Sequence, residues 1–337
     1  MHGRRRQQER EPTQDEKEQA KQRVARYCAL NTHVMDLRSK SVFTADALDA
    51  TKRLLEQNTE LHTVWNYRRA VFMGLESWQD PDERQKMLDG ELAFLLEIIK
   101  KNIKSYWMWN HRMWALSMLP RPEWQRELLL VTRLLSLDAR NYHGWDYRRF
   151  VVARLREAAT DKHAVDEQEF AFTTEQINRD CANHSAWHNR SKLLPAILAS
   201  RGTDDNSSRM RILQTENDLI LNAIYTDPDD QNAWLYYDWL LDIQKSDADR
   251  CRLLRGKIAA IRELLELDED CKRPLIELVG AFAELERLQS GSVAADEKSE
   301  CLETLHKLKT IDSYHIGRYT DMSEALSKQW GVVGLEM

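Results

Sequence analysis

The sequence has few of the residues that interrupt helices. Its 337 residues include only 11 glycines and 7 prolines, and runs of β-branched residues are scarce. Leucine, alanine, glutamate, lysine and arginine dominate instead, and these residues have high helix propensity. The composition therefore favours helix over sheet. With 42% hydrophobic residues, the chain is also long enough to bury a large core.

Cysteines are few and scattered. The five residues are odd in number and contain no Cys-x-x-Cys pair, so neither a disulfide framework nor a zinc ribbon is indicated. We expect free thiols in a reducing, cytoplasmic compartment. The cysteines are Cys28, Cys181, Cys251, Cys271 and Cys301.

Long apolar runs and an excess of positive charge are also lacking. No run approaches the length of a membrane span or of a signal-peptide core. The net charge of −6 gives a nucleic-acid partner no general electrostatic support. The only strong basic run, Arg4 to Arg6, lies in residues 1–14, which we expect to form a mobile charged tail. Residues 15–337 are expected to form one helical-repeat domain.

Common catalytic signatures are missing as well. The sequence has no GxGxxG, no GxxxxGK[ST], no HExxH and no nucleophile-elbow motif. His184 and His188 are four residues apart, which could place two ring nitrogens on one helix face. However, no third ligand is evident and His184 is expected in a loop, so we do not favour a metal site there. On these grounds the chain alone does not look like a complete enzyme.

Tryptophan, in contrast, is abundant, with 11 residues, and it marks a repeat. Five tryptophans follow an Asn or Asp by seven residues, at intervals of 44, 36, 42 and 47 residues. Four of them precede an Arg by three residues, and the fifth has Tyr237 there. The tryptophans are Trp65, Trp109, Trp145, Trp187 and Trp234, and the arginines are Arg68, Arg112, Arg148 and Arg190. Two weaker copies, at Leu275 and Tyr319, lack the tryptophan.

A period of about 40 residues is typical of one supersecondary unit that is stacked many times. Apolar residues at helical spacing, such as Leu92, Leu95, Leu96 and Ile99, predict the first helix of each unit. The Asn or Asp ends that helix, a short polar loop follows, and the tryptophan opens the second helix. We therefore predict an all-α fold, a curved right-handed superhelix of antiparallel hairpins with five clear and two degenerate repeats.

The repeated tryptophan and arginine are interpreted as structural rather than chemical. Each tryptophan supplies a large area for burial. Each arginine carries five fixed donors and can reach the carbonyls that end a neighbouring helix.

Packing does not explain the polar residues that stand in two consecutive loops. The loops before the tryptophans lie at the same end of the hairpins and should line up along one rim. This rim carries Lys104 and Tyr106 in one loop, and Asn141, Tyr142 and His143 in the next. A lysine, a histidine and two phenols could bind a phosphate. The alternative, which the pattern alone favours, is that these residues are simply solvated.

The N/D-x6-W-x-x-R repeat resembles that of the protein prenyltransferase α subunits. Within this family, three stretches are similar to the Rab (type II) geranylgeranyltransferase branch: "NYHGWDYRRFV", "SAWHNRSKLLP" and "TDPDDQNAWLYYDWLL". The farnesyl and type I branches typically have W-x-H-R-x-W in place of "WDYRRF". The resemblance covers roughly residues 40–325 and the first few residues.

The resemblance implies an enzyme of two subunits. The hairpins would wrap around a separate β subunit, which holds a catalytic zinc and most of the lipid pocket. The pair would transfer geranylgeranyl from geranylgeranyl diphosphate to C-terminal cysteines of a Rab GTPase that an escort protein presents. Zinc makes the thiolate, and positive groups stabilise the departing diphosphate.

The resemblance also assigns roles to rim residues. Lys104 matches the family's lysine that reaches the diphosphate, and Tyr106 lies beside it. Asn141, Tyr142 and His143 match the next loop, which faces the diphosphate and the mouth of the active site. Lys104 and His143 are therefore the predicted catalytic residues.

The sequence departs from the family pattern at two positions, and it leaves open a role for His2 and two alternative functions. Trp107 stands where relatives that read a CaaX carboxylate have Gln, and Asp238 stands where an Arg is expected near the fifth tryptophan. His2 could occupy the open zinc position of the partner. The alternative functions are the α subunit of a farnesyl or type I transferase, and a non-catalytic helical scaffold that binds peptides.

Overall fold

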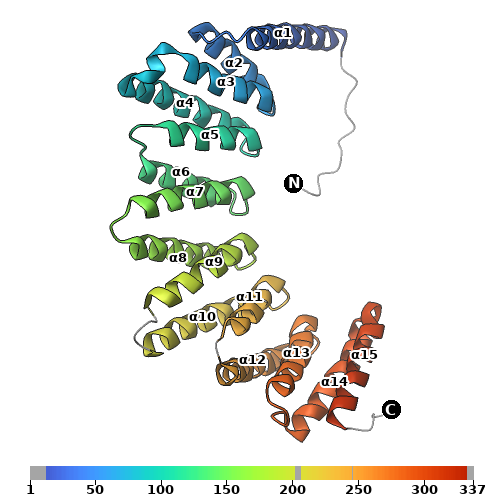
Figure 1. Ribbon diagram of the computed structural model, residues 1–337. Coiled ribbons are helices and arrows are strands. Elements are labelled where there is room, and N and C mark those ends of the chain that lie inside the picture. Colours follow the sequence, from blue (N-terminus) through green and yellow to red (C-terminus); the bar gives the residue numbers. More distant parts are fainter. Residues whose placement is uncertain (1–12, 202–205, 245, 332–337) are drawn as a thin grey trace. The chain divides into compact units, whose positions relative to one another are not determined.

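The computed structural model describes residues 13–201, 206–244 and 246–331. Within these ranges the regular structure is entirely helical, with 15 α-helices and two short 3-10 helices (Figure 1). This confirms the all-α prediction. His2 and most of the predicted tail lie outside the described residues. The chain divides into two compact units, one up to Ser136 plus Asn141–Arg154, the other Leu137–Arg140 plus Leu155 onwards.

The first unit consists of a leading helix and stacked hairpins. Thr13 caps the leading helix in a capping box with Glu16, and Val34 is its only buried residue, as expected for a helix without an apolar stripe. The elements are α1 (Gln14–Ser39), α2 (Ala45–Gln57), α3 (His62–Gly74), η1 (Glu76–Gln79), α4 (Pro81–Lys101), α5 (Tyr106–Met118), α6 (Trp124–Leu137) and α7 (Tyr142–Ala158).

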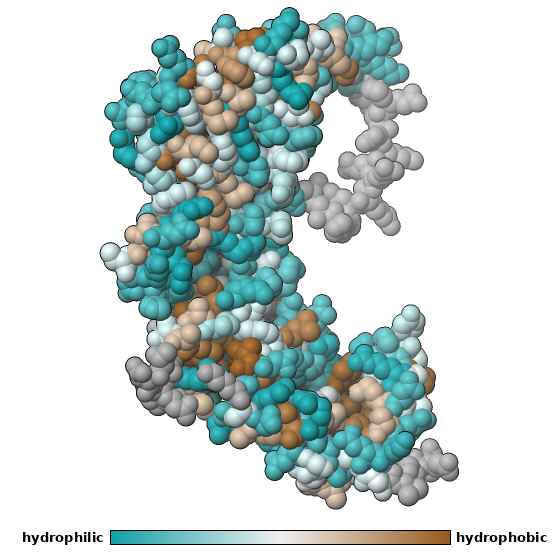
Figure 2. All heavy atoms as spheres, viewed as in Figure 1, coloured by the Kyte–Doolittle hydropathy of each residue, from teal (hydrophilic) through white to brown (hydrophobic). Residues whose placement is uncertain are grey.

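The second unit repeats the same arrangement. Its hairpins pair α8 with α9, α10 with α11, α12 with α13 and α14 with α15. The elements are α8 (Lys162–Arg179), α9 (His184–Arg201), α10 (Asn206–Thr226), α11 (Gln231–Asp242), α12 (Asp247–Leu267), α13 (Lys272–Leu288), α14 (Ala295–Ile311), η2 (Ser313–His315) and α15 (Ile316–Trp330). Stacked helical hairpins are thus confirmed within each unit. In Figure 2 the visible face is mostly hydrophilic, with separate apolar patches.

The Asn or Asp of each repeat ends the first helix, as predicted. Helices α2, α4, α8 and α12 stop one residue before Asn58, Asn102, Asp180 and Asp268, which are their C-caps. Helices α6, α10 and α14 stop at the equivalent position.

The second helix begins earlier than predicted, three residues before the tryptophan. The prediction that Tyr106, Tyr142, His143 and His184 lie in loops is therefore wrong, because they form first helical turns. The reason is an N-cap four residues before the tryptophan: Ser105, Asn141, Asn183 and Asp230 each accept a backbone N–H of that turn.

Each repeat tryptophan also fixes the loop before its helix. The indole N–H of Trp65, Trp109, Trp187 and Trp234 donates to the carbonyl six residues earlier, at 2.7–2.8 Å. That carbonyl belongs to the residue after the Asn or Asp, which explains the seven-residue spacing. All five repeat tryptophans, including Trp145, are at most 3% exposed, in agreement with a structural role.

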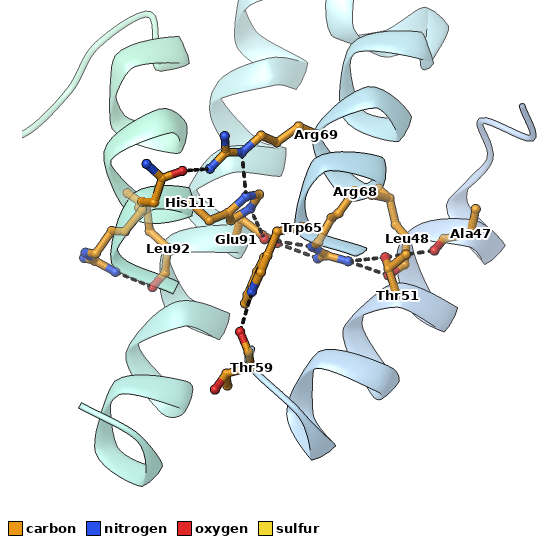
Figure 3. Close-up of polar contacts among 12 residues, drawn as sticks. Ala47, Leu48, Thr51, Thr59, Trp65, Arg68, Arg69, Glu91, Leu92 and His111 are labelled. Atoms are coloured by element: carbon orange, nitrogen blue, oxygen red, sulfur yellow. Dashed lines mark hydrogen bonds and ion pairs between the residues drawn. The ribbon is translucent and has the colours of Figure 1, made fainter. Parts of the chain in front are cut away.

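The four repeat arginines are buried, and three of them bind a carboxylate of the next hairpin. Arg68 donates to Glu91 at 2.8 Å (Figure 3), Arg112 to Glu127 at 3.0 Å and Arg190 to Glu216 at 2.8 Å. Arg148 is also buried and donates to Thr132 at 2.7 Å.

These arginines reach carbonyls too, but not where predicted. The acceptors are Leu48, Leu92 and Phe170, which lie inside α2, α4 and α8 rather than at their ends. Each acceptor stands nine residues before the last residue of its helix, so the carbonyls that end the helix are more than two turns away.

Each of these glutamates also binds the residue two positions after the next tryptophan. Glu91 pairs with His111 at 2.8 Å, Glu216 with Tyr236 at 2.7 Å, and Glu127 with Tyr147. One carboxylate therefore joins two successive hairpins. This glutamate is not among the residues predicted from the repeat, although it stands 18 residues before Trp109, Trp145 and Trp234.

The polarity of this contact is reversed in the sixth hairpin. Lys257 occupies the position of the glutamate and donates to Asp238 and Glu277, both at 2.7 Å. Asp238 lies near the expected arginine position, so the contact at this repeat differs from the Arg–Glu pairs of the other hairpins. The ion pair is kept with its charges exchanged.

Candidate functional site

The predicted rim residues lie at the first turns of α5 and α7, within the first unit. Tyr106 and His143 come from neighbouring hairpins, and their rings are 5.9 Å apart between centroids in an edge-on contact. Tyr142 contacts His143 in the same manner at 5.5 Å. Lys104 lies two residues before α5 and is exposed. The structure thus brings three of the predicted aromatic residues together.

Buried polar residues hold these first turns in place. Ser105 is 1% exposed, caps α5, and its hydroxyl lies 3.4 Å from the Thr59 carbonyl of the preceding hairpin. Asn102 donates to the Thr59 hydroxyl at 2.8 Å. The turn that carries Lys104 and Tyr106 is therefore attached to the hairpin before it.

Asn141 and Gly144 position the start of α7. The Asn141 side chain is 4% exposed and its oxygen accepts the Gly144 N–H at 2.9 Å. A Cβ at Gly144 would lie 2.9 Å from Leu134 and 3.0 Å from Leu135, so glycine allows α7 to approach α6 closely. The structure therefore places Asn141 in the cap of α7, while its neighbours Tyr142 and His143 project from the first turn.

Four polar groups of this rim have no hydrogen-bond or ion-pair partner among the described residues. They are the Lys104 ammonium, the Tyr106 and Tyr142 hydroxyls, and the His143 ring. Tyr106 is 53% and Tyr142 68% exposed. One cation and three directed donors, with no carboxylate among them, can bind the oxygens of a phosphate or diphosphate. We call these four residues the donor cluster.

Metal binding finds no support in the described part of the chain. No three His, Cys, Asp or Glu side chains there are grouped closely enough to hold a metal ion. His184 and His188 both lie on α9, and His184 is its first residue rather than a loop residue. Across residues 13–201, 206–244 and 246–331, no helix has the length and apolar character needed to cross a membrane.

The repeats match a known family model, the protein prenyltransferase alpha subunit repeat. The matched residues are 44–75, 88–119, 124–155, 166–197 and 213–244. These stretches coincide with the first five hairpins, from α2–α3 to α10–α11.

Curated relatives carry the same description in several organisms. The chain is 37% identical to the geranylgeranyl transferase type-2 subunit alpha of Saccharomyces cerevisiae, over 72% of each chain. It is 31% identical to that of Candida albicans, over 91% of this chain and 92% of the relative. The human protein is 38% identical over 71% of this chain, which spans only 42% of that longer relative.

A solved structure shares the fold. A chain of the Candida albicans protein geranylgeranyltransferase-I complexed with GGPP superposes with a TM-score of 0.65, over 90% of this chain and 91% of that one. The sequence identity is 18%, so this likeness concerns the fold alone. From the repeats and from relatives that match over most of their length, the chain belongs to the geranylgeranyl transferase type-2 alpha subunits of the protein prenyltransferase alpha-subunit family.

Proposed function

We propose that this chain pairs with a prenyltransferase β subunit, and that the pair transfers geranylgeranyl from geranylgeranyl diphosphate to C-terminal cysteines of a Rab GTPase. An escort protein presents the Rab. Family membership supports the type of reaction. The observation that carries the role of this chain is the donor cluster, which joins two hairpins of the first unit and whose donors have no hydrogen-bond partner among the residues that the structure describes.

In this reaction the cysteine sulfur forms a bond to C1 of the prenyl chain while the bond from C1 to the diphosphate oxygen breaks. Negative charge therefore builds up on the diphosphate. Lys104 neutralises part of this charge, and the Tyr106 and Tyr142 hydroxyls and His143 donate hydrogen bonds to the oxygens. Donors that are fixed before the reaction lower its barrier most, because they need no reorganisation. Asn141 contributes by holding the α7 turn.

The metal chemistry is assigned to the partner. Zinc held by the β subunit would lower the pKa of the acceptor thiol, so that the cysteine would react as its thiolate. The described residues of this chain offer no cluster of ligands for it. We place the enzyme in the cytoplasm, where its five cysteines remain thiols.

Co-expression with each prenyltransferase β subunit of the source organism tests this proposal. The purified pair is assayed for transfer of labelled geranylgeranyl to a Rab with and without escort protein, and to CaaX peptides. We expect escort-dependent transfer to the Rab with one β subunit. Transfer to CaaX peptides without escort would assign the chain to the farnesyl or type I branch. If no β subunit co-purified, the interpretation of the chain as a non-catalytic scaffold would replace its interpretation as an enzyme subunit.

A further inference from the structure

We infer that a groove between α4 and α6, with the end of α5 at its bottom, binds a short amphipathic helix of a partner protein that carries acidic residues beside its apolar face. The groove has a volume of about 1040 Å³, and all of its lining residues belong to the first unit. None of them belongs to the donor cluster. Binding in this groove therefore does not depend on the proposed transfer reaction.

A short first helix opens the groove. Helix α4 has 21 residues and α6 has only 14, although both end one residue before the Asn or Asp of the repeat. Helix α6 therefore lacks about two turns at its start. The interval between Trp109 and Trp145, 36 residues, is the shortest of the four and reflects this loss. Leu119 and Arg121 each precede a proline, which disfavours helix in the linker before α6.

The missing turns leave leucine side chains accessible. Leu92 and Leu96 on α4 and Leu130 on α6 are partly exposed, and Leu129 on α6 is 71% exposed. Leu119, at the end of α5, continues the apolar surface at the bottom of the groove. Because these leucines line a single groove, one apolar face of a bound segment can contact them together.

The size and the walls of the groove favour a helix as the occupant. Two turns of helix, with a diameter of 10–12 Å, fill roughly 800–1200 Å³, which is close to the volume of the groove. The walls are helices that already use their main-chain groups, so an extended peptide buried between them would leave its own N–H and C=O groups without partners. A helix satisfies these groups internally and presents leucines at i, i+3, i+4 and i+7 to the walls.

The charges along the groove favour acidic residues on the bound helix. Three exposed arginines line it, Arg121, Arg126 and Arg133, against two exposed carboxylates, Asp89 and Glu123. The chain as a whole has a net charge of −6, so this excess of cations is a local feature. The arginines stand on α6 and its preceding linker, whereas Asp89 stands on α4. The acidic side of the bound helix should therefore face α6.

Arg133 is the arginine that is available for a new ion pair. Arg126 lies 3.3 Å from Glu123, and Arg121 lies 2.8 Å from Asp82. The Arg133 guanidinium has no partner among the residues that the structure describes. Arg133 follows Leu129 by four residues, so the two side chains lie on one face of α6. A bound helix that covers Leu129 can therefore place a carboxylate beside Arg133.

The test measures binding of two fluorescein-labelled peptides of about 15 residues to the co-expressed full chain by anisotropy. Both peptides carry leucines at i, i+3, i+4 and i+7, and the residues beside the leucines are glutamates in one peptide and lysines in the other. We expect the glutamate peptide to bind at least about tenfold more tightly. Leu129→Glu and Arg133→Glu should each weaken its binding about tenfold or more.

Val24→Glu is the matched control. Val24 is an apolar residue on α1 that is 60% exposed and lies outside the groove, so this variant should bind the glutamate peptide as wild type does. Geranylgeranyl transfer by the heterodimer should be unchanged in all three variants, which separates this groove from the proposed function.

Two outcomes would overturn the inference. Equal binding of both peptides, or binding that neither groove variant weakens, would show that the groove does not select an acidic helix. Self-association of the wild-type protein that Leu129→Glu abolishes would identify a second copy of the chain as the occupant instead. Should Leu129→Glu reduce the yield of folded protein, Arg133→Glu still decides the question.

Discussion

The Glu91 carboxylate lies in the interior of the first unit, 2% exposed, between Arg68 and His111 (Figure 3). Burial by itself raises the pKa of this carboxyl, but the charge and hydrogen bonds of Arg68, with the hydrogen bond of His111, lower it to about 2. Burial lowers the pKa of His111 to about 4, although Glu91 opposes this. The His111 ring is therefore neutral at pH 7. Its Nδ1 accepts from Arg69 at 3.2 Å, so its Nε2–H donates to Glu91.

From the lowered pKa values of Glu91 and His111 we predict that the protein loses stability in acid in two steps. Between about pH 6.5 and 4 the unfolded chain takes up a proton at His111 that the folded chain does not, so stability falls as pH falls. From about pH 4.5 toward 2, the unfolded chain is protonated at Glu91 while the folded carboxylate stays ionised, and stability falls further. The free energy of unfolding of the heterodimer, measured in urea at each pH, checks this.

The His111→Gln variant isolates the upper step. It should have a smaller loss of stability than wild type between pH 6.5 and 4, whatever its absolute stability. Identical slopes for the two proteins over this range would show that His111 does not titrate in this way.

The pair of Arg190 and Glu216 gives a second test at this scale. Both side chains are at most 2% exposed. Replacing only the arginine, as in Arg190→Met, leaves a buried carboxylate without its cation and should cost about 3–5 kcal/mol of unfolding free energy. Adding Glu216→Leu removes that charge and should recover at least about half of the loss. A double variant as unstable as Arg190→Met would contradict the assigned ion pair.

At the scale of the helical elements, the N-cap before each tryptophan sets where the second helix begins. Asn183 accepts from the Ala186 N–H and donates to the Ala139 carbonyl at 3.1 Å. Asn183→Ala should therefore lower the unfolding free energy by about 1–2 kcal/mol. The partly exposed Ser185 on the same turn is the control, and Ser185→Ala should change it by less than about 0.5 kcal/mol. Thermal unfolding of the purified proteins measures both, and equal effects would argue against the cap.

Much of each hairpin could be predicted from the sequence because its signals are local. The Asn or Asp that ends the first helix and the buried tryptophan act within seven residues of each other. The start of the second helix was misplaced because the cap residue varies among Ser, Asn and Asp. The carboxylate partners of the arginines were missed because they lie 15 to 26 residues away, on another helix.

For the candidate site, too, the local features could be predicted from the sequence and the contacts between hairpins could not. Its residues could be proposed from the alignment of repeats, since the first turns of successive second helices lie on one side of the stack. The contact of Tyr106 with His143 and the position of Asn141 in a cap depend on how two hairpins pack, which no local pattern encodes.

At the scale of the whole chain, we predict that the stability of the chain depends on the β subunit. Several leucines, including Leu137 at 83% and Leu267 at 85%, are exposed when the chain is alone. A partner that binds only the folded state stabilises it by an amount that rises with the logarithm of its affinity and concentration. The co-expressed pair should therefore unfold several degrees above the isolated chain in calorimetry, and an unchanged Tm would contradict pairing. One unfolding transition would support a single domain over residues 15–337, whereas two would argue for independent units.

The central claim, that this chain stabilises the departing diphosphate, is tested most directly by single-turnover transfer with the Lys104→Ala heterodimer. Lys101→Ala is the matched control, since Lys101 is an exposed lysine three residues earlier in the same segment. The account predicts that Lys104→Ala forms the heterodimer normally but transfers geranylgeranyl about ten to a thousand times more slowly, while Lys101→Ala transfers at the wild-type rate. A wild-type rate for Lys104→Ala would contradict the claim and indicate that Lys104 is simply a solvated surface lysine.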